Sequence, residues 1–441
     1  MNNNQEDTIC AIATAQGGAI GLIRVSGPQA IAYTSAIFNP IKSGKKLKDC
    51  LPYSLTYGHI IEGNETVDEV MVSLFKAPHS YTGEDSTEIA CHGSSYILQK
   101  VIQMLIKQGC RLAQPGEYTQ RAFLNGKMDL TQAESVADVI HSANRAELEN
   151  AHRLLSGALS KKIAALTAQV KDISARLELD VDFAEEEADP DFAGWETRFV
   201  SIRETIQQIL NSFRGKAALS RLPLAVLYGA PNAGKSSLVN ALLGEDRVLV
   251  SNVPGTTRDF VEVRLFLDGG EIRLVDTAGI ADKATDELDA LSMKKSREIL
   301  EEADLKILVL DGSDSSDPVV QPDFIVHSKC DLRDSLPETG LCISSKTGVG
   351  LAELKSVMNA ALFKKNENQE DLWITSEREK TCLEEALAGV NRVLDLLKTN
   401  PAVELLAFEM QLVRRALQSI TGEISSEDIL QSIFAGFCIG K

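Results

Sequence analysis

The chain has 441 residues, 44% hydrophobic and 24% charged, which is the composition of an ordinary globular protein with room for several cores. Its 45 Lys and Arg against 63 Asp and Glu leave a net charge of −18, which argues against a protein that coats nucleic acid by bulk charge. We find no secretory leader, no apolar run of membrane-spanning length and no zinc-ligand spacing among the eight cysteines. We therefore expect a cytoplasmic protein without membrane contact.

Residues 1–117 predict a mixed α+β domain, with strands near 19–25 and 69–75 and a helix near 95–107. Residues 118–217 predict helices. Apolar residues recur there at steps of three and four, the spacing of one helix face: Leu159, Ile163, Leu166, Val170, Ile173 and Leu177. A second helix is expected over about 195–213.

Strands alternate with helices over 218–365, the pattern of a parallel sheet with crossover connections. The helical period then returns over 366–441, in two series: Leu383, Leu387, Val390, Leu394 and Leu397, then Leu406, Met410, Val413, Leu417 and Ile420. The simplest fold is a discontinuous helical domain, in parts 118–217 and 366–441, with an α/β domain inserted between them.

The most specific motif is Gly229–Ser236, which fits G-x-x-x-x-G-K-[ST] between an apolar strand at 223–228 and a helix. Such glycines let backbone N–H groups converge on phosphate oxygens at the start of a helix. Lys235 is expected to reach the β- and γ-phosphates, and the Ser236 hydroxyl to hold Mg²⁺. The motif predicts a P-loop nucleotide-binding domain.

Two further motifs follow in the order expected for a GTPase. Asp276-Thr-Ala-Gly279 ends a strand, where the carboxylate takes Mg²⁺ through water and the Gly279 N–H reaches a γ-phosphate. Gly255-Thr-Thr-Arg-Asp259 lies between the two and offers hydroxyls that complete a metal shell. On its own this last motif is weak, but the order makes it specific.

This set of motifs resembles the MnmE/TrmE family of tRNA-modification GTPases, and the resemblance extends over nearly the whole chain. The residues that support it lie in Tyr81–Asp85, Pro115–Asn125, Lys127–Glu134 and the ending Phe437–Lys441. The resemblance implies a homodimer formed through an N-terminal folate-binding domain (1–117), and a GTPase that uses K⁺ as well as Mg²⁺. It also implies an FAD-dependent partner of the MnmG/GidA type. Together the two proteins would modify tRNA, with one carbon taken from a folate. The product is a carboxymethylaminomethyl-type group at C5 of the wobble uridine.

The resemblance also assigns residues. It assigns the binding of Mg²⁺ to Ser236 and Thr257, and the binding of K⁺ to Asn232, Ser251, Val253 and Thr256. A folate of the 5-formyl-tetrahydrofolate type falls to Arg24, Glu88, Lys127 and Lys441, with Cys438 near that site as a catalytic candidate. The nucleotide falls to Asn232, Ala233, Gly234, Lys235, Ser236, Ser237, Ser251, Thr256, Thr257, Asp276, Thr277, Ala278, Gly279, Ser328, Lys329, Asp331, Ser344, Ser345 and Lys346.

The chain departs from the family pattern at three places. Ser328 stands where the guanine motif Asn-Lys-x-Asp has Asn, which predicts weaker nucleotide binding with guanine preference retained through Asp331. The link 311–323 is short for a parallel crossover, so the inserted domain is expected to lack one helix. The family's catalytic Glu aligns with Asp289, with Glu287 as the competing candidate.

Two other functions fit parts of the sequence. A GTPase switch in ribosome assembly would need a basic RNA-binding module beside the nucleotide domain, which neither flank shows. The chain could also be a folate-dependent one-carbon transferase, in which the nucleotide domain would be an attached regulatory domain. The motif-rich N-terminal region and the Cys-Ile-Gly-Lys ending favour the tRNA-modification GTPase.

Overall fold

The structure is a computed structural model, which describes residues 7–15, 17–41, 46–182, 192–215, 221–245, 260–277, 297–311, 320–332, 339–363, 372–399 and 402–440. The chain forms two compact units. The first combines residues 1–137, 152–211 and 376–441, and the second combines 138–151 with 212–375. Among the described helices, none has the length and apolar character needed to cross a bilayer.

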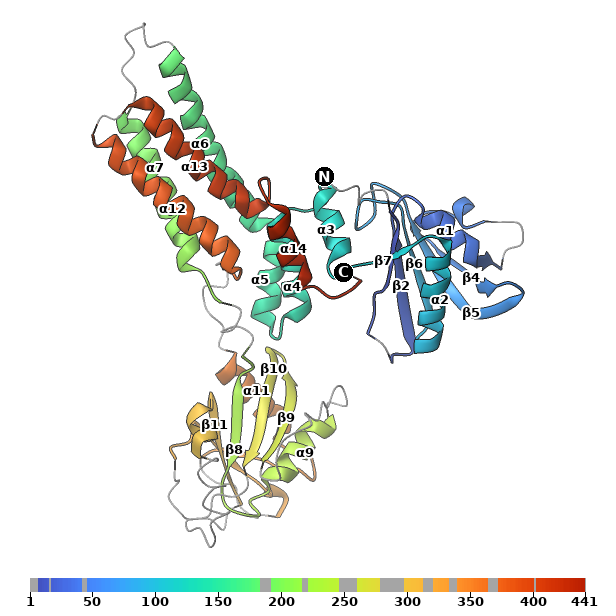
Figure 1. The fold of residues 1–441 in the computed structure, drawn as a ribbon. Helices are drawn as coiled ribbons and strands as arrows, with labels where there is room; N and C mark the ends of the chain where they lie inside the picture. Colours follow the sequence, from blue (N-terminus) through green and yellow to red (C-terminus); the bar gives the residue numbers. More distant parts are fainter. Residues whose placement is uncertain are drawn as a thin grey trace. The chain divides into compact units, whose positions relative to one another are not determined.

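The N-terminal part of the first unit is a seven-stranded, mostly antiparallel sheet in the order β3-β4-β5-β6-β2-β1-β7. Helices α1 (Ala30–Ile37) and α2 (Ser95–Gln108) cover one of its faces (Figure 1). The strands are β1 (Ile9–Ile12), β2 (Ile20–Ser26), β3 (Phe38–Pro40), β4 (Leu55–Glu62), β5 (Glu65–Phe75), β6 (Ser86–His92) and β7 (Arg111–Leu112). The α+β prediction for this region is confirmed.

The rest of the first unit is helical. Short helices α3 (Glu117–Leu124) and α14 (Glu427–Ala435) and the first part of α4 (Leu130–His141) accompany a bundle of α6 (Ala158–Asp182), α7 (Phe192–Asn211), α12 (Glu377–Leu397) and α13 (Val403–Thr421). α4 ends in the second unit, and most of α5 (Arg145–Leu155) also belongs to that unit. In the bundle α6 packs on α13 and α7 on α12, so segments from both sides of the insertion share one core. The periodic residues of α6 and α13 named above are all buried. The discontinuous helical domain is therefore confirmed.

The inserted domain is a six-stranded sheet in the order β13-β12-β11-β8-β10-β9. Its strands are β8 (Leu224–Tyr228), β9 (Phe260–Leu267), β10 (Gly270–Thr277), β11 (Leu305–Leu310), β12 (Phe324–His327) and β13 (Leu341–Cys342). All neighbours pair in parallel except the β9–β10 hairpin. Helices α9 (Lys235–Glu245) and α11 (Leu351–Leu362) and a helical turn over 297–302 supply further apolar residues to the cores on its two faces.

Both faces of β8 are buried, which explains why its five residues read as one apolar run without alternation. The P-loop leaves the carboxyl end of this strand, the end at which open parallel sheets bind their ligands. The expected loss of a crossover helix concerns the link 311–323, of which 312–319 lie outside the described residues.

Candidate functional site

The P-loop joins β8 to α9 and takes its shape from backbone conformations that disfavour most side chains. Gly229 has φ 145°, and a Cβ there would lie 2.3 Å from the Val309 carbonyl oxygen, so only glycine fits. Asn232 and Gly234 also have positive φ, 65° and 94°. Lys235 Nζ donates to the carbonyl oxygens of Gly229 and Ala230 at 3.0 and 2.9 Å. The ammonium group is thus held at the loop that would enclose the phosphates.

Ser236 and Asp276 meet at the start of α9. The Ser236 hydroxyl donates to Asp276 Oδ2 at 2.5 Å, while Asp276 Oδ1 is buried without a hydrogen-bond partner among the described residues. A buried carboxylate oxygen left unpaired beside a hydroxyl is an arrangement that a hard cation with its water shell would satisfy. These two residues therefore fit Mg²⁺. Thr277, one residue on, is buried and donates its hydroxyl to the Leu227 carbonyl oxygen at 3.0 Å.

The predicted guanine motif follows β12 and packs on the P-loop. Ser328 is buried, and its hydroxyl donates to the carbonyl oxygen of Ala233 at 2.5 Å. Lys329 Nζ donates to the Asn232 carbonyl oxygen at 2.8 Å and lies 3.3 Å from an Asp311 carboxylate oxygen. Serine at 328 therefore keeps a direct tie between the guanine motif and the phosphate loop.

Asp331 is held by the neighbouring loop. The Ser344 hydroxyl donates to Asp331 Oδ1 at 2.7 Å, which leaves the other carboxylate oxygen for a base. Ser345 and Lys346 lie in the turn that follows, while Ser237 lies in the first turn of α9. The structure thus brings Asn232–Ser237, Asp276, Thr277, Ser328–Asp331 and Ser344–Lys346 to one end of the sheet.

The remaining predictions for this domain lie outside the described residues. They are Ser251, Val253, Thr256, Thr257, Ala278, Gly279 and both catalytic candidates, Asp289 and Glu287.

A second polar cluster lies in the first unit, around Arg24 on β2. Its guanidinium donates to Glu88 on the adjacent β6 at 2.9 Å and to the Gly440 carbonyl oxygen at 3.1 Å. The rings of Tyr81 and Tyr118 each lie 5.6 Å from it. Burial raises the pKa of both tyrosines, so their rings act there as neutral surfaces. Arg24 thus joins the sheet, two aromatic rings and the C-terminal tail.

The other predicted folate residues lie around this cluster to different degrees. Cys438 is exposed in the tail, and its carbonyl oxygen accepts from the Gly116 N–H at 3.4 Å. Lys127 donates to the Pro78 carbonyl oxygen at 2.9 Å, and its side chain packs beside Gly83 in the same loop as Tyr81. Lys441 lies outside the described residues.

The Tyr81–Asp85 loop is held in place by ion pairs of the buried Arg121 side chain. Arg121 donates to Glu84 at 3.1 Å, to Glu117 at 2.9 Å and to Asp7 at 2.5 Å. Burial lowers the pKa of Arg121, but the attraction of Glu84 and its other partners raises it above the usual value overall. The motifs that contain Arg121, Tyr81 and Tyr118 are visible in the sequence, but the roles of these three residues are not, because their contacts come from distant segments.

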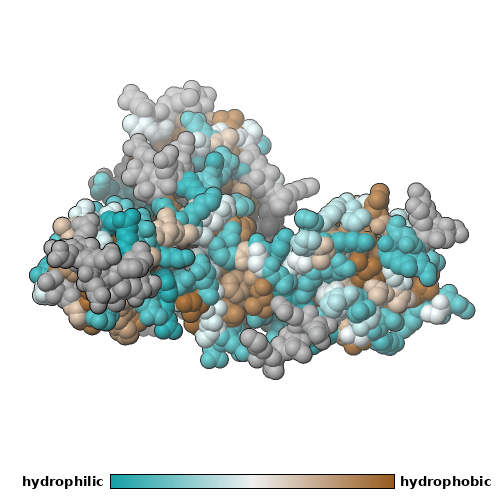
Figure 2. Space-filling view, turned by 90° about the horizontal axis from the view of Figure 1, so that it is seen from above, coloured by the Kyte–Doolittle hydropathy of each residue, from teal (hydrophilic) through white to brown (hydrophobic). Residues whose placement is uncertain are grey.

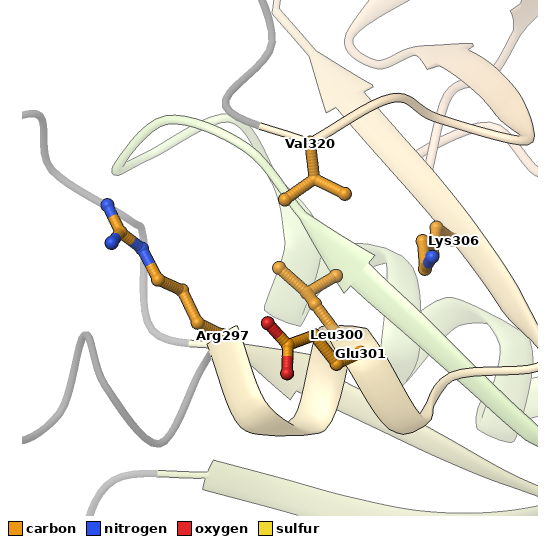
Figure 3. Close-up of a pocket in the computed structure, with 5 residues that line it drawn as sticks. All are labelled: Arg297, Leu300, Glu301, Lys306 and Val320. Carbon is orange, nitrogen blue, oxygen red and sulfur yellow. The ribbon is translucent and has the colours of Figure 1, made fainter.

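One pocket of about 370 Å³ lies on the inserted domain and is lined by Arg297, Leu300, Glu301, Lys306 and Val320 (Figure 3). Leu300 and Val320 face each other across it, and both belong to the core on that face of the sheet. It contains none of the predicted nucleotide residues. The segments just before Arg297 and Val320 lie outside the described residues, so the pocket supports no site.

The chain starts with an α+β domain, and a helical domain with an inserted P-loop domain follows it in the sequence. This organisation defines a multidomain GTPase. Comparison with protein families agrees: the profile of the "GTP-binding protein TrmE N-terminus" matches residues 8–127, and that of the "MnmE helical domain" matches 130–438. A "tRNA modification GTPase MnmE" of Bacteroides thetaiotaomicron is 42% identical over 99% of this chain and all of its own length. Its counterpart in Flavobacterium johnsoniae is 38% identical over 99% of both. The chain belongs to the MnmE family and is a GTPase.

Solved structures were matched over a smaller share of the chain. Aquifex aeolicus Era bound to GDP and aluminium fluoride covers 38% of this chain and 67% of its own, at 22% identity and a TM-score of 0.28. The G domain of T. maritima FeoB covers 32% of this chain and 99% of its own, at 27% identity and a TM-score of 0.26.

Proposed function

We propose that this GTPase acts in the modification of the wobble uridine of certain tRNAs, adding a carboxymethylaminomethyl-type group at C5. A folate of the 5-formyl-tetrahydrofolate type supplies one carbon, and an FAD-dependent partner of the MnmG/GidA type takes part. The observation that supports the GTP cycle most strongly is the hydrogen bond between Ser236 and Asp276 beside the P-loop. Asp276 Oδ1 is buried there and has no hydrogen-bond partner among the described residues. The curated relatives are named for action on tRNA.

In the nucleotide site, the positions of Lys235, Ser236 and Asp276 support a task for each. Lys235 would offset the charge of the β- and γ-phosphates, Ser236 would hold Mg²⁺, and Asp276 would orient the water around that ion. Thr257, which lies outside the described residues, is proposed as the second ligand of Mg²⁺. Mg²⁺ supplies charge neutralisation on the phosphate oxygens when bound. Asp331 accepts the N–H donors of guanine with the oxygen that Ser344 leaves unused.

A monovalent site for K⁺ is proposed at Asn232, Ser251, Val253 and Thr256. Of these, Asn232 is described, and its positive φ sets it at the bend of the P-loop. Oxygen donors from side chains and backbone suit a hard monovalent cation, and a second cation near the phosphates offsets developing negative charge. Asp289 is proposed to orient the attacking water, with Glu287 as the alternative.

The folate is proposed to lie at the Arg24 cluster. The carboxylates of the folate tail would pair with Arg24 or with the two lysines, Lys127 and Lys441, and Glu88 would accept from the pterin N–H groups. The bond between Arg24 and Glu88 favours the lysines for the tail, because the pterin and the tail are opposite ends of a folate. Tyr81 is partly exposed and offers apolar ring surface for a flat heterocycle, while the buried Tyr118 packs against Arg24 inside the fold. Cys438 is exposed and lies two residues before Gly440, whose carbonyl oxygen accepts from Arg24; its thiol is the nucleophile candidate.

We propose that two copies associate through the open face of the N-terminal sheet. Tyr57 and Met71 are directly paired across β4 and β5, and Leu55 and Ile20 lie on the same face, all of them exposed. Helices α1 and α2 pack on the opposite face. Apolar patches interrupt the hydrophilic surface of this domain, at the right of Figure 2. An uncovered apolar sheet face of this kind favours an interface between like copies.

The tRNA itself is proposed to bind mainly through the partner, because the net charge of −18 gives this chain little long-range attraction for phosphates. The test is mass spectrometry of wobble nucleosides from cells that lack this chain, complemented with the wild type or with Lys235→Ala. We expect the C5 group to be absent, to return with the wild type and not with Lys235→Ala. Unchanged nucleosides in the deletion strain would contradict the proposal.

A further inference from the structure

The turn of the β9–β10 hairpin is bonded to the loop between α4 and α5. The Arg145 N–H donates to the Gly269 carbonyl oxygen at 2.9 Å, and the Glu271 N–H donates to the Ala143 carbonyl oxygen at 3.0 Å. These two bonds join backbone to backbone, in the manner of an antiparallel strand pair. All of these residues belong to the second unit. We call this contact the hairpin joint.

Both sides of the hairpin joint are shaped for close approach. Gly270 has φ 148°, and a Cβ there would lie 2.7 Å from Asn144 Cα, so any side chain would force the two backbones apart. On the other side, Asn144 and Glu147 form a reciprocal cap at the start of α5: the Asn144 amide donates to Glu147 at 2.6 Å, and the Glu147 N–H donates to Asn144 Oδ1 at 2.9 Å. The cap fixes the loop that the hairpin contacts.

The other end of the same hairpin leads to the nucleotide motifs. β9 starts at Phe260, directly after the Gly255–Asp259 motif, and β10 ends at Thr277, directly after Asp276. The strands pair along all eight residues, a length of roughly 27 Å at about 3.4 Å per residue. A fully paired hairpin resists bending, so a shift imposed at its open end is passed to its turn.

Each helix that flanks the hairpin joint has its joint-side end in the second unit, which holds residues 138–151, and its far end in the first. α4 spans Leu130–His141 and α5 spans Arg145–Leu155, while residues 130–137 and 152–155 count to the first unit. Both helices therefore extend from the loop at the joint into the helical domain. At the joint, β9 and β10, whose other ends adjoin the nucleotide motifs, contact the loop between α4 and α5. These two helices continue into the first unit.

We propose that the hairpin joint couples the nucleotide state of the inserted domain to helices α4 and α5 of the helical domain, with Gly270 and Asn144 as its positioning residues. The proposal rests on the proposed GTP cycle. It predicts that the nucleotide state changes the protection of the Arg145 N–H, which lies at the far end of the hairpin from Ser236 and Asp276.

The test is hydrogen exchange by mass spectrometry on the full-length protein, with GDP alone and with GDP plus aluminium fluoride, in KCl and MgCl₂. We expect the peptides covering 140–150 to exchange differently in the two states. In Gly270→Ala this difference is lost, while binding of GDP and the exchange difference around Ser236 are kept. Gly244→Ala is the matched control, because a Cβ at Gly244 meets none of the described residues within 4 Å, and it should behave as the wild type.

Asn144→Ala gives a second perturbation that leaves the inserted domain untouched and only loosens the cap. It should lose the same difference, which keeps the proposal testable if Gly270→Ala does not fold. The coupling role is overturned if 140–150 exchanges alike in both states in the wild type, or if both variants retain the difference. Failure of the wild type to bind the nucleotide at all would instead contradict the proposed function.

Discussion

Removal of the Ser328 hydroxyl tests how the guanine motif supports the phosphate loop. Ser328→Ala deletes the 2.5 Å hydrogen bond to the Ala233 carbonyl oxygen, while the Ser328 N–H keeps its own bond to Leu310 at 2.8 Å. Ser328 is 4% exposed and Ala233 is fully buried. A buried carbonyl deprived of this donor costs about 1 to 2 kcal/mol. Because the bond orders the loop that binds phosphate, the cost appears as weaker nucleotide binding, about 5- to 30-fold in Kd.

The assay is a fluorescence titration with a labelled GDP, followed by competition with unlabelled GDP and ADP. We expect the loss for both nucleotides to be similar, since Asp331 and its bond from Ser344 remain and selectivity for guanine depends on them. Thr347→Ala, at an exposed position of the neighbouring loop, is the control. Wild-type affinity in Ser328→Ala would refute the role of this bond, and equal binding of GDP and ADP by the wild type would refute guanine preference.

Two further predictions concern stability. Met410→Ala, at a fully buried position of α13, should lower the free energy of unfolding of the helical domain by about 2 to 5 kcal/mol, measured by urea denaturation, while Phe408→Ala at an exposed position should change it little. His92 is bonded to Asp68 at 2.6 Å, and this bond raises the pKa of the imidazole. The protonated form therefore stabilises the fold, an effect fully present below about pH 6.5 and lost as the pH rises through the raised pKa. Thermal melts of His92→Gln should fall below the wild type at about pH 6, and the gap should narrow as the pH rises through the raised pKa; a constant gap would contradict this assignment.

The helical domain could be predicted from the sequence because burial repeats every three to four residues, as Leu166 and Met410 show on two helices that pack together. The P-loop could be predicted because its geometry depends on glycines close in sequence. The bond from Arg24 to the Gly440 carbonyl oxygen joins residues 416 positions apart, and no local pattern reveals such a contact. Those two positions were reached through resemblance to a family, not through periodicity.

The Ser328 hydrogen bond shows the same limit at smaller range. The sequence predicted that Ser328 stands at the guanine motif and lacks an amide, but not that its hydroxyl contacts the P-loop, 95 residues earlier. The hairpin joint was not predicted either, because Asn144 and Gly270 are ordinary turn residues in their own segments. Contacts of this kind depend on how the parts of a fold meet.

The central claim, a GTPase with a cation-assisted phosphate site, is tested most directly by GTP hydrolysis of the purified protein in KCl and in NaCl at matched ionic strength. The account predicts clear stimulation by K⁺, because the proposed site at Asn232 and Thr256 would offset negative charge as the γ-phosphate leaves. Hydrolysis at the same rate in both salts would contradict that site, and absence of hydrolysis in either would contradict the GTPase itself.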